Sequence, residues 1–275
     1  MTTAFVLGGG GILGAVEVGM LRALFEADVR PDLVLGTSVG ALNGAMVARD
    51  PAVSVVERLT ELWRGVGESR GSGYAERTLP AFRRAVATGT HLYSPKPMRQ
   101  RLTDEFGDLR FDDLAVRFQV CAASIERAAE HWFDSGPVVD AVLASAAVPG
   151  LLPPAKVGGE HFLDGGVVNS IPLARAVQLG GTRVFVLQVG RIDRPLKPPR
   201  RPWEVARVSF EIARRHRFVR ELAELPDGVE CHVLPARGTS GRDDTIWAAR
   251  DFGSVQHRID QTYDASVEYL RTALR

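Results

Sequence analysis

A serine with a glycine two residues away on each side forms the most informative stretch of this chain, Gly36-Thr37-Ser38-Val39-Gly40. A short, mainly apolar run at residues 32–35 precedes it, and a run of small residues at 41–48 follows. The spacing predicts a strand, a sharp turn with Ser38 at its apex, and a helix, which is the arrangement of a nucleophile elbow. In such an elbow the serine has strained backbone angles, and the residues two positions away must be small so that strand and helix can approach each other. By itself the pattern fits either a catalytic serine or an ordinary glycine-punctuated turn.

A glycine run at residues 8–11 lies between a short apolar segment and a segment with apolar residues at helical spacing, 12–26. Together with Gly14, the run has the spacing of the dinucleotide-binding fingerprint. That use requires a carboxylate at the end of the second strand to hold the ribose, but this strand ends at Ser38, and Asp32 lies at its start. The missing carboxylate argues against a nucleotide-binding oxidoreductase or binding protein, which stays as the alternative.

A glycine-rich turn at the start of a helix can also stabilise negative charge on a reacting oxygen. The first backbone N–H groups of a helix have no partner within it, and glycine allows a substrate to approach them closely. Two parallel strands, the second ending at Ser38, would place this turn beside the serine at the carboxyl end of the sheet. The sequence therefore predicts an oxyanion hole at Gly9, Gly10, Gly11 and Ile12.

A serine hydroxyl needs a base to become a nucleophile. His232 and His257 follow Ser38 in the order that α/β-hydrolases use, but His232 lies within an apolar run and His257 between apolar residues of a helical pattern. Asp164 is the stronger candidate, because it ends a predicted strand and precedes Gly165-Gly166, a turn expected to expose its side chain at the sheet edge. An Asp-Gly turn without a catalytic role fits the same spacing.

The composition is ordinary for a globular protein, with 275 residues, 45% of them hydrophobic and 24% charged, and a formal net charge of +1. This balance predicts no nucleic-acid partner. No apolar run reaches the roughly 18 residues of a membrane span, and the N-terminal residues lack the basic flank of a signal peptide, so we expect a cytoplasmic protein. Cys121 and Cys231 lie in apolar runs and predict buried free thiols, and no Cys/His cluster has zinc spacing, so we predict no metal and no cofactor.

The predicted elements alternate between strand and helix, and the two apolar strands before Ser38 imply a parallel pair buried on both faces. Residues 51–115 contain helix-like pieces separated by Gly, Ser and Pro, which fits a helical cap over a site or a plain layer of surface helices. Strand patterns resume at 117–123, and residues 191–275 are mainly helical with a long amphipathic helix at the end. No repeat or linker divides the chain, so we predict a single domain, 1–275.

Five sequence blocks, in register, resemble those of the patatin-like phospholipases. In chain order they are residues 8–15, 36–40, 144–154 (similar to that family's Ala-Ser-x-Ala-x-Pro block), 164–166 and 167–172. The resemblance covers residues 4–48 and 117–190 well, and elsewhere only the general layout. Five blocks in register are far more specific than any one of them.

The resemblance implies a three-layer α/β/α fold with a mainly parallel central sheet, and a Ser-Asp dyad that uses no histidine. Ser38 would be the nucleophile, Asp164 the group that accepts its proton, and the glycine run the oxyanion hole. The activity implied is hydrolysis of lipid carboxylic esters (phospholipid, lysophospholipid or neutral acyl ester) through an acyl-enzyme. A non-catalytic lipid-binding relative differs from this only by turnover. The remaining motif positions are Gly14, Gly36, Gly40, Gly165 and Gly166.

The chain departs from the family pattern at Leu13, where many relatives carry Arg or Lys. A basic side chain there could position an anionic head group or the loop itself. The departure leaves the dyad intact and weakens the case for a phospholipid substrate.

Residues 191–220 hold ten basic residues against three acidic ones. In the second half, Trp203, Ala206, Phe210 and Ala213 share one helical stripe. A basic amphipathic helix over 203–220 would suit peripheral contact with an anionic membrane, and a packed helix with a solvated arginine face fits the same pattern. The sequence indicates no oligomeric state.

Overall fold

The computed structural model describes residues 1–68, 89–190, 192, 195–236 and 255–274. The strands within these residues are β1 (Thr3–Leu7), β2 (Leu33–Thr37), β3 (Arg117–Ser124), β4 (Ala129–Phe133), β5 (Ala155–Val157), β6 (Glu160–Asp164), β7 (Arg183–Leu187) and β8 (Glu230–Val233). The α-helices are α1 (Ala15–Glu26), α2 (Val39–Arg49), α3 (Ser54–Glu68), α5 (Lys96–Phe106), α6 (Val138–Ser145), α7 (Gly166–Asn169), α8 (Leu173–Gln178), α9 (Pro202–Ala223) and α10 (Val255–Ala273). Short 3₁₀ turns occupy Gly11–Gly14 and Phe111–Asp113.

One mixed sheet runs through the molecule in the order β5-β6-β3-β2-β1-β7-β8, with β4 paired to β3. The strands from β3 to β8 in this order pair in parallel, and β4, β5 and β6 add antiparallel pairs at one side. The predicted parallel pair before Ser38 is β1 with β2. The mainly parallel sheet is therefore confirmed.

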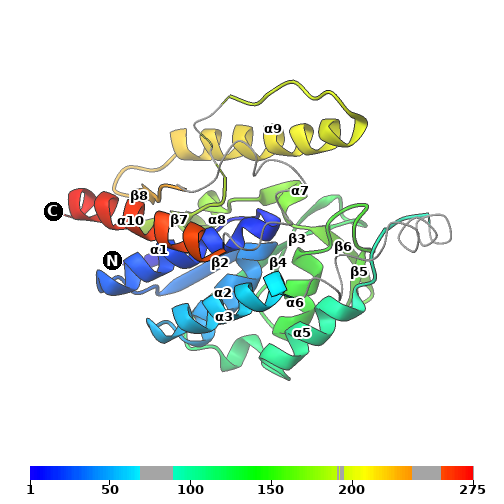
Figure 1. Cartoon of the computed structure of the whole chain (residues 1–275), viewed down its shortest axis with the longest axis horizontal. Coiled ribbons are helices and arrows are strands. Elements are labelled where there is room, and N and C mark those ends of the chain that lie inside the picture. The colour runs from blue at the N-terminus through cyan, green and yellow to red at the C-terminus, as the bar shows by residue number, and fades with distance from the viewer. Residues whose placement is uncertain (69–88, 191, 193–194, 237–254, 275) are drawn as a thin grey trace.

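Side chains of β1 alternate between two hydrophobic cores, as the period of a strand requires. Phe5 and Leu7 lie in the core that α1, α2, α3 and α10 cover. Ala4 and Val6 lie in the core on the other face, under α8 and α9. Helices cover both faces of the sheet in Figure 1, with α7, α8 and α9 on one side and α1, α2 and α3 on the other. This arrangement confirms the three-layer α/β/α fold.

Strands β2 and β6 both pair with the same edge of β3. β2 pairs with its first part, where Thr37 lies opposite Cys121, and β6 pairs with its last part, where Asp164 lies opposite Ala122. β4 pairs with Val120–Ser124 and overlaps both stretches, so it occupies the opposite edge. The ends of β2 and β6 therefore meet next to each other on β3, although no local sequence pattern relates them.

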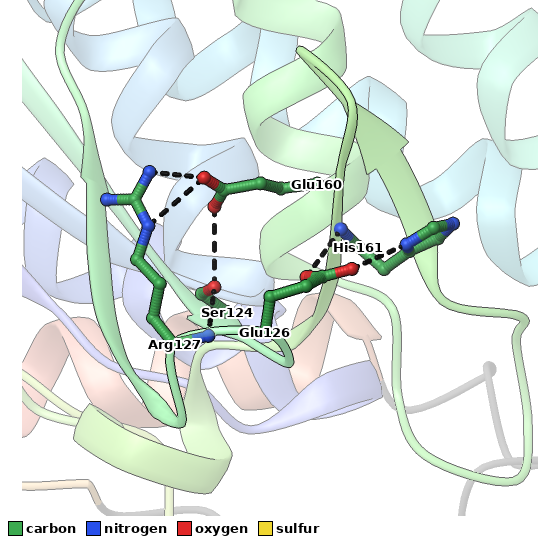
Figure 2. A network of polar contacts seen from close by, with 5 residues as sticks. All are labelled: Ser124, Glu126, Arg127, Glu160 and His161. Carbon is green, nitrogen blue, oxygen red and sulfur yellow. Dashed lines mark hydrogen bonds and ion pairs between the residues drawn. The ribbon is translucent and has the colours of Figure 1, made fainter.

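A polar network holds the turn after β3 against the start of β6 (Figure 2). Glu126 accepts hydrogen bonds from the backbone N–H of His161 at 2.9 Å and faces its Nδ1 at 2.7 Å. These bonds hold the pKa of the Glu126 carboxyl at about 2. On the other side of the turn, Arg127 forms an ion pair with Glu160, and Ser124 donates to the same carboxylate at 3.4 Å. The network therefore attaches the start of β6 to the turn that follows β3.

The two described helices of the 51–115 region pack as a layer on the domain. α3 buries Val55, Val56, Leu59 and Trp63 in the core with α1 and α2, and α5 packs against α6. Residues 69–88 lie outside the described residues, so a cap formed by them stays a prediction. For α3 and α5, the surface-layer interpretation is the one that the contacts support.

The C-terminal part contributes to both faces and to the sheet edge. α9 packs on α7 and α8, β8 pairs in parallel with β7, and α10 packs along α1. The predicted C-terminal amphipathic helix is confirmed over Val255–Ala273, with Val255, Ile259 and Leu270 buried. Within the described residues, no helix combines the length and the apolar character that crossing a membrane requires. The two free cysteines were expected to be buried, and Cys121 is, whereas Cys231 is partly exposed.

The close crossing of α1 and α10 depends on a glycine. A Cβ atom on Gly19 would lie 2.3 Å from the carbonyl oxygen of Ile259 and 2.8 Å from the backbone nitrogen of Tyr263. We predict that Gly19→Ala lowers the free energy of unfolding by about 1–3 kcal/mol, because the two backbones must separate. Gly65→Ala on α3 is the matched control, since its Cβ would meet no atom within 4 Å. Chemical denaturation of both variants measures the difference, and equal stability of the two would contradict this account.

Candidate active site

The serine at the end of β2 adopts the strained backbone expected of a nucleophile elbow. Ser38 has φ 56° and ψ −120° and directly precedes α2. A Cβ on Gly36 would lie 2.4 Å from the carbonyl oxygen of Gly40, and one on Gly40 would lie 2.2 Å from that of Leu7. Larger residues at these two positions would separate the strand from the helix. The sequence argument for small residues on both sides of Ser38 is thus confirmed by the packing.

Ser38 and Asp164 form a buried hydrogen-bonded pair. The Ser38 hydroxyl donates to Asp164 Oδ2 at 2.6 Å, and the backbone N–H of Gly166 donates to Oδ1 at 2.7 Å. The two residues are only 7% and 3% exposed. Burial raises the pKa of Asp164 to about 6, against the opposing effect of the two hydrogen bonds. The carboxyl is therefore a stronger proton acceptor than an exposed aspartate when it is ionised.

The segment after Asp164 differs from the exposed turn that we expected. Asp164 is buried, and Gly166 begins α7. A Cβ on Gly165 would lie 2.2 Å from the carbonyl oxygen of Cys121, and one on Gly166 would lie 2.5 Å from the Phe210 ring. Both glycines are thus required by close approach, of β3 in one case and of α9 in the other.

Ser145, at the end of α6, ties the two halves of the pair together. Its hydroxyl accepts a hydrogen bond from the Ser38 backbone N–H at 2.7 Å and donates to the Cys121 carbonyl at 2.6 Å. Its own carbonyl accepts from the backbone N–H of Gly165 at 3.1 Å. In the sequence, Ser145 lies in the block at 144–154 that resembles the family, but the sequence assigned it no role. Only the folded chain brings it to both Ser38 and Gly165.

The glycine run lies beside Ser38, as the parallel strands predicted. A Cβ on Gly9 would come within 3.4 Å of the Ser38 Cβ. The Gly9 N–H, however, donates to the carbonyl of Ser170 at 2.9 Å, so Gly9 is not available as an oxyanion donor in this conformation. This corrects the prediction for Gly9. Its place in the site is explained by close approach, since a side chain there would fill the space next to Ser38.

Gly10, Gly11 and Ile12 are the other residues predicted to donate to the oxyanion. The first hydrogen bond of the 3₁₀ turn is donated by Leu13 to the Gly10 carbonyl at 3.3 Å, so Gly11 and Ile12 precede the first donor of the turn. Gly10 and Gly11 are exposed. Gly11 has φ +58°, which favours glycine, and a Cβ on Gly10 would lie 1.5 Å from Val189 Cγ2. The loop therefore requires glycine at both positions.

A buried polar network supports the loop from behind. Asn43 donates to the Gly14 carbonyl at 3.0 Å and to Glu17 Oε2 at 2.8 Å, and it accepts from the Trp63 indole N–H at 3.1 Å. Burial raises the pKa of the Glu17 carboxyl well above its ordinary value, which favours the neutral acid. A Cβ on Gly14 would lie 2.4 Å from the Trp63 ring. This network joins α1, α2 and α3, and apart from Gly14 no sequence pattern indicates it.

His232 and His257, the two histidines considered as a base, contact residues other than Ser38. His232 lies in β8, where its ring stacks on Phe185 and its Nδ1 lies 3.3 Å from the Tyr269 hydroxyl. His257 lies on α10 beside Gln261. In the part of the chain that the structure describes, the hydroxyl of Ser38 is bonded to a carboxylate and to no imidazole.

Comparison with known proteins identifies a matching family and similar sequences. A family model described as patatin-like phospholipase matches residues 5–177. Lysophospholipase nte1 of Aspergillus terreus (strain NIH 2624 / FGSC A1156) is 32% identical over 192 residues, which make up 70% of this chain and 12% of that protein. Lysophospholipase nte1 of Emericella nidulans (strain FGSC A4) is 34% identical over 188 residues, again 12% of its length. This chain therefore spans only a small part of the curated relatives that it matches.

Among solved structures, the fold is similar to that of VipD from Legionella pneumophila. The TM-score is 0.53 at 14% sequence identity, and the match covers 99% of this chain and 67% of VipD. At this identity the likeness concerns the fold alone. The family model, which matches more than half of the chain, and relatives above 30% identity show that this chain belongs to the patatin-like phospholipase family.

Proposed function

We propose that this protein is a serine acyl hydrolase that cleaves carboxylic esters of lipids through a Ser-Asp dyad. The observation that carries the proposal is the 2.6 Å hydrogen bond from Ser38 to a buried Asp164, beside a glycine loop that presents backbone N–H groups. A nucleophile, its proton acceptor and oxyanion donors are what acyl transfer requires. Membership of the patatin-like phospholipases and the name lysophospholipase on two relatives support a lipid ester as the substrate class.

The first half of the reaction forms an acyl-enzyme. Ser38 Oγ attacks the ester carbonyl carbon, and its proton passes to Asp164 Oδ2. The negative charge on the carbonyl oxygen is stabilised by the N–H groups of Gly10 and Gly11, with Ile12 as the next donor along the turn. The tetrahedral intermediate then collapses, the alcohol leaves with the proton from Asp164, and the acyl group stays on Ser38.

The second half returns the enzyme to its starting state. Water attacks the acyl carbon, Asp164 accepts a proton from the water, and the same loop stabilises the second oxyanion. The bond to Ser38 Oγ breaks and the serine regains its proton, which releases the fatty acid. Asp164 acts alone as acid and base in both halves.

Loss of the nucleophile should abolish turnover. We predict that Ser38→Ala lowers kcat for a p-nitrophenyl ester by at least about 10³-fold, and that it removes covalent labelling by a fluorophosphonate. Ser135→Ala is the matched control, because Ser135 is exposed and follows β4, whereas the dyad lies at the ends of β2 and β6. Mass spectrometry of the labelled wild-type protein should place the adduct on Ser38. Turnover that persists in Ser38→Ala would overturn the proposal, and a wild type that binds lipid without turnover or labelling would indicate a non-catalytic relative.

The raised pKa of Asp164 predicts the pH dependence of activity. Asp164 must be ionised to accept a proton, and its pKa of about 6 means that kcat/KM should rise through pH 6 and level off above it. Asp164→Asn should remove both the activity and this titration. A wild-type profile that stays flat down to pH 4 would contradict the assignment.

The raised pKa of Asp164 also predicts that the stability of the folded protein falls with rising pH, whereas its activity rises. Because the pKa of Asp164 is raised from 3.8 to about 6 on folding, the carboxyl contributes its full stability at low pH and loses it as pH rises through 6. We therefore expect Asp164→Asn to match the wild type in Tm near pH 4 and to exceed it near pH 8. Thermal unfolding at the two pH values measures this.

The outward face of α9 is where we propose contact with a lipid surface. Val205, Ile212 and Val219 are 50%, 55% and 55% exposed, and their spacing of seven residues puts them on one face of the helix. This face is not the stripe predicted from the sequence, of which Phe210 packs against Gly166 and Ala213 is exposed. Apolar side chains on a helix from an arginine-rich segment suit the interface of an anionic membrane.

Vesicle binding tests this contact. We expect stronger sedimentation with phosphatidylcholine vesicles that contain phosphatidylglycerol than with phosphatidylcholine alone, and a decrease as salt is added. Replacing Val205, Ile212 and Val219 by Ser together should abolish binding and leave p-nitrophenyl ester hydrolysis intact. Val53→Ser with Ile125→Ser, at positions 50% and 45% exposed in turns outside α9, is the matched control. Equal binding by the two variants would exclude α9 as the contact.

A further inference from the structure

A buried arginine on α9 reaches the base of the glycine loop. Arg214 is 5% exposed. Its Nη1 donates to the Gly9 carbonyl at 3.3 Å, and Nη1 and Nη2 both donate to the Val189 carbonyl at 3.0 Å. Its Nε lies 3.3 Å from Glu211 Oε1. A guanidinium buried to this extent is costly unless its donors are used, and here Nη1 and Nη2 make three hydrogen bonds to two main-chain oxygens.

The two acceptors are both connected to the proposed oxyanion donors. Val189 packs where a side chain on Gly10 would lie, so holding its carbonyl holds the wall of the loop. The Gly9 carbonyl belongs to the same peptide unit as the Gly10 N–H. The described chain contains no cis peptide bond, so this N–H points away from the carbonyl and hence away from Arg214.

A hydrogen bond to the Gly9 oxygen therefore acts on the Gly10 N–H in two ways. It fixes the rotation of the peptide plane, which sets the direction of the N–H. It also polarises the amide, which strengthens the opposite donor by about 10–30% in condensed-phase estimates of cooperativity. The charge of the guanidinium makes this effect larger than that of a neutral donor.

The cation comes from far along the chain. The loop itself carries Leu13, and Arg214 lies 205 residues after Gly9 and beyond residues 5–177, which the family model matches. The same helix contacts the other half of the dyad, because Phe210 packs on Gly166 and Arg217 donates to the Val168 carbonyl at 2.7 Å. α9 thus touches both the glycine loop and the segment after Asp164.

We propose that Arg214 is a positioning residue for the oxyanion hole, which orients and polarises the Gly9–Gly10 peptide so that the Gly10 N–H faces the reacting oxygen. This rests on the proposed hydrolase function. It predicts an effect on the chemical step, because the oxyanion forms only in the transition state and the substrate carbonyl gains less from the donor.

The test compares Arg214→Met and Arg214→Lys with Arg220→Met. Arg220 is on the same helix with a side chain 62% exposed, so its replacement controls for loss of charge and for helix effects. For a soluble p-nitrophenyl ester we expect kcat of Arg214→Met to fall about 10- to 100-fold, somewhat less than for complete loss of an oxyanion donor, with KM within about twofold. The rate constant of fluorophosphonate inactivation should fall in parallel. Arg214→Lys, which keeps the charge and loses the fork, should lie between, and Arg220→Met should match the wild type.

Several results would overturn the proposal. One is unchanged kcat and inactivation rate in a folded Arg214→Met, and another is a higher KM at unchanged kcat, which would assign Arg214 to substrate binding. A loss of kcat that tracks Tm across both Arg214 variants would assign it to stability alone.

A measurement that does not depend on ester hydrolysis tests this proposal separately from the hydrolase function. Amide hydrogen exchange of a peptide covering residues 8–14 should be faster in Arg214→Met than in Arg220→Met, because the loop loses its anchor. If the wild type neither hydrolyses esters nor reacts with the probe, the hydrolase proposal fails, and exchange still decides whether Arg214 holds the loop. Unchanged exchange of this peptide counts against Arg214 in either case.

Discussion

The site depends on one edge of β3 being divided between two strands. β2 pairs along its first part and ends at Thr37, and β6 pairs along its last part in the opposite direction and ends at Asp164. The two strand ends therefore meet over neighbouring residues of β3, and side chains 126 positions apart in the sequence come within 2.6 Å. Because backbone ladders set this meeting point, a slip of one residue in either pairing would move Ser38 or Asp164 to the other face.

Burial gives the pair its chemical character. In the mechanism that we propose, a single carboxylate acts as the base, and at its ordinary pKa it would hold a proton weakly. The closed environment raises the pKa of Asp164 to about 6, and the Gly166 N–H occupies one oxygen so that the other faces Ser38. Ser145 stabilises the strained elbow from below through the Ser38 backbone N–H. The strained backbone of Ser38 and the burial of the Asp164 carboxyl are each unfavourable alone. Hydrogen bonds from the main-chain N–H groups of Ser38 and Gly166 offset these costs.

α9 brings a part of the chain beyond the family-matched residues to the site. Its inward side carries Phe210, Arg214 and Arg217, which contact main-chain positions near Ser38 and Asp164. Its outward side carries exposed apolar residues. A rigid helix with these two faces places the surface that we propose for lipid contact on the side of α9 opposite the loop that we propose for the oxyanion.

The sequence by itself determined the local parts. Gly36 and Gly40 predicted the elbow because close approach of strand and helix is a local requirement, and unbroken apolar runs predicted the parallel strands because both faces of the sheet are covered. The resemblance singled out Ser38 and Asp164 as partners. The tertiary structure alone decided that they touch, that the Gly9 N–H is used by Ser170, and that Arg214 reaches the loop from 205 residues away. Spacing records which backbone conformations a segment prefers, whereas these contacts follow from strand register and helix packing between distant segments, which no local pattern encodes.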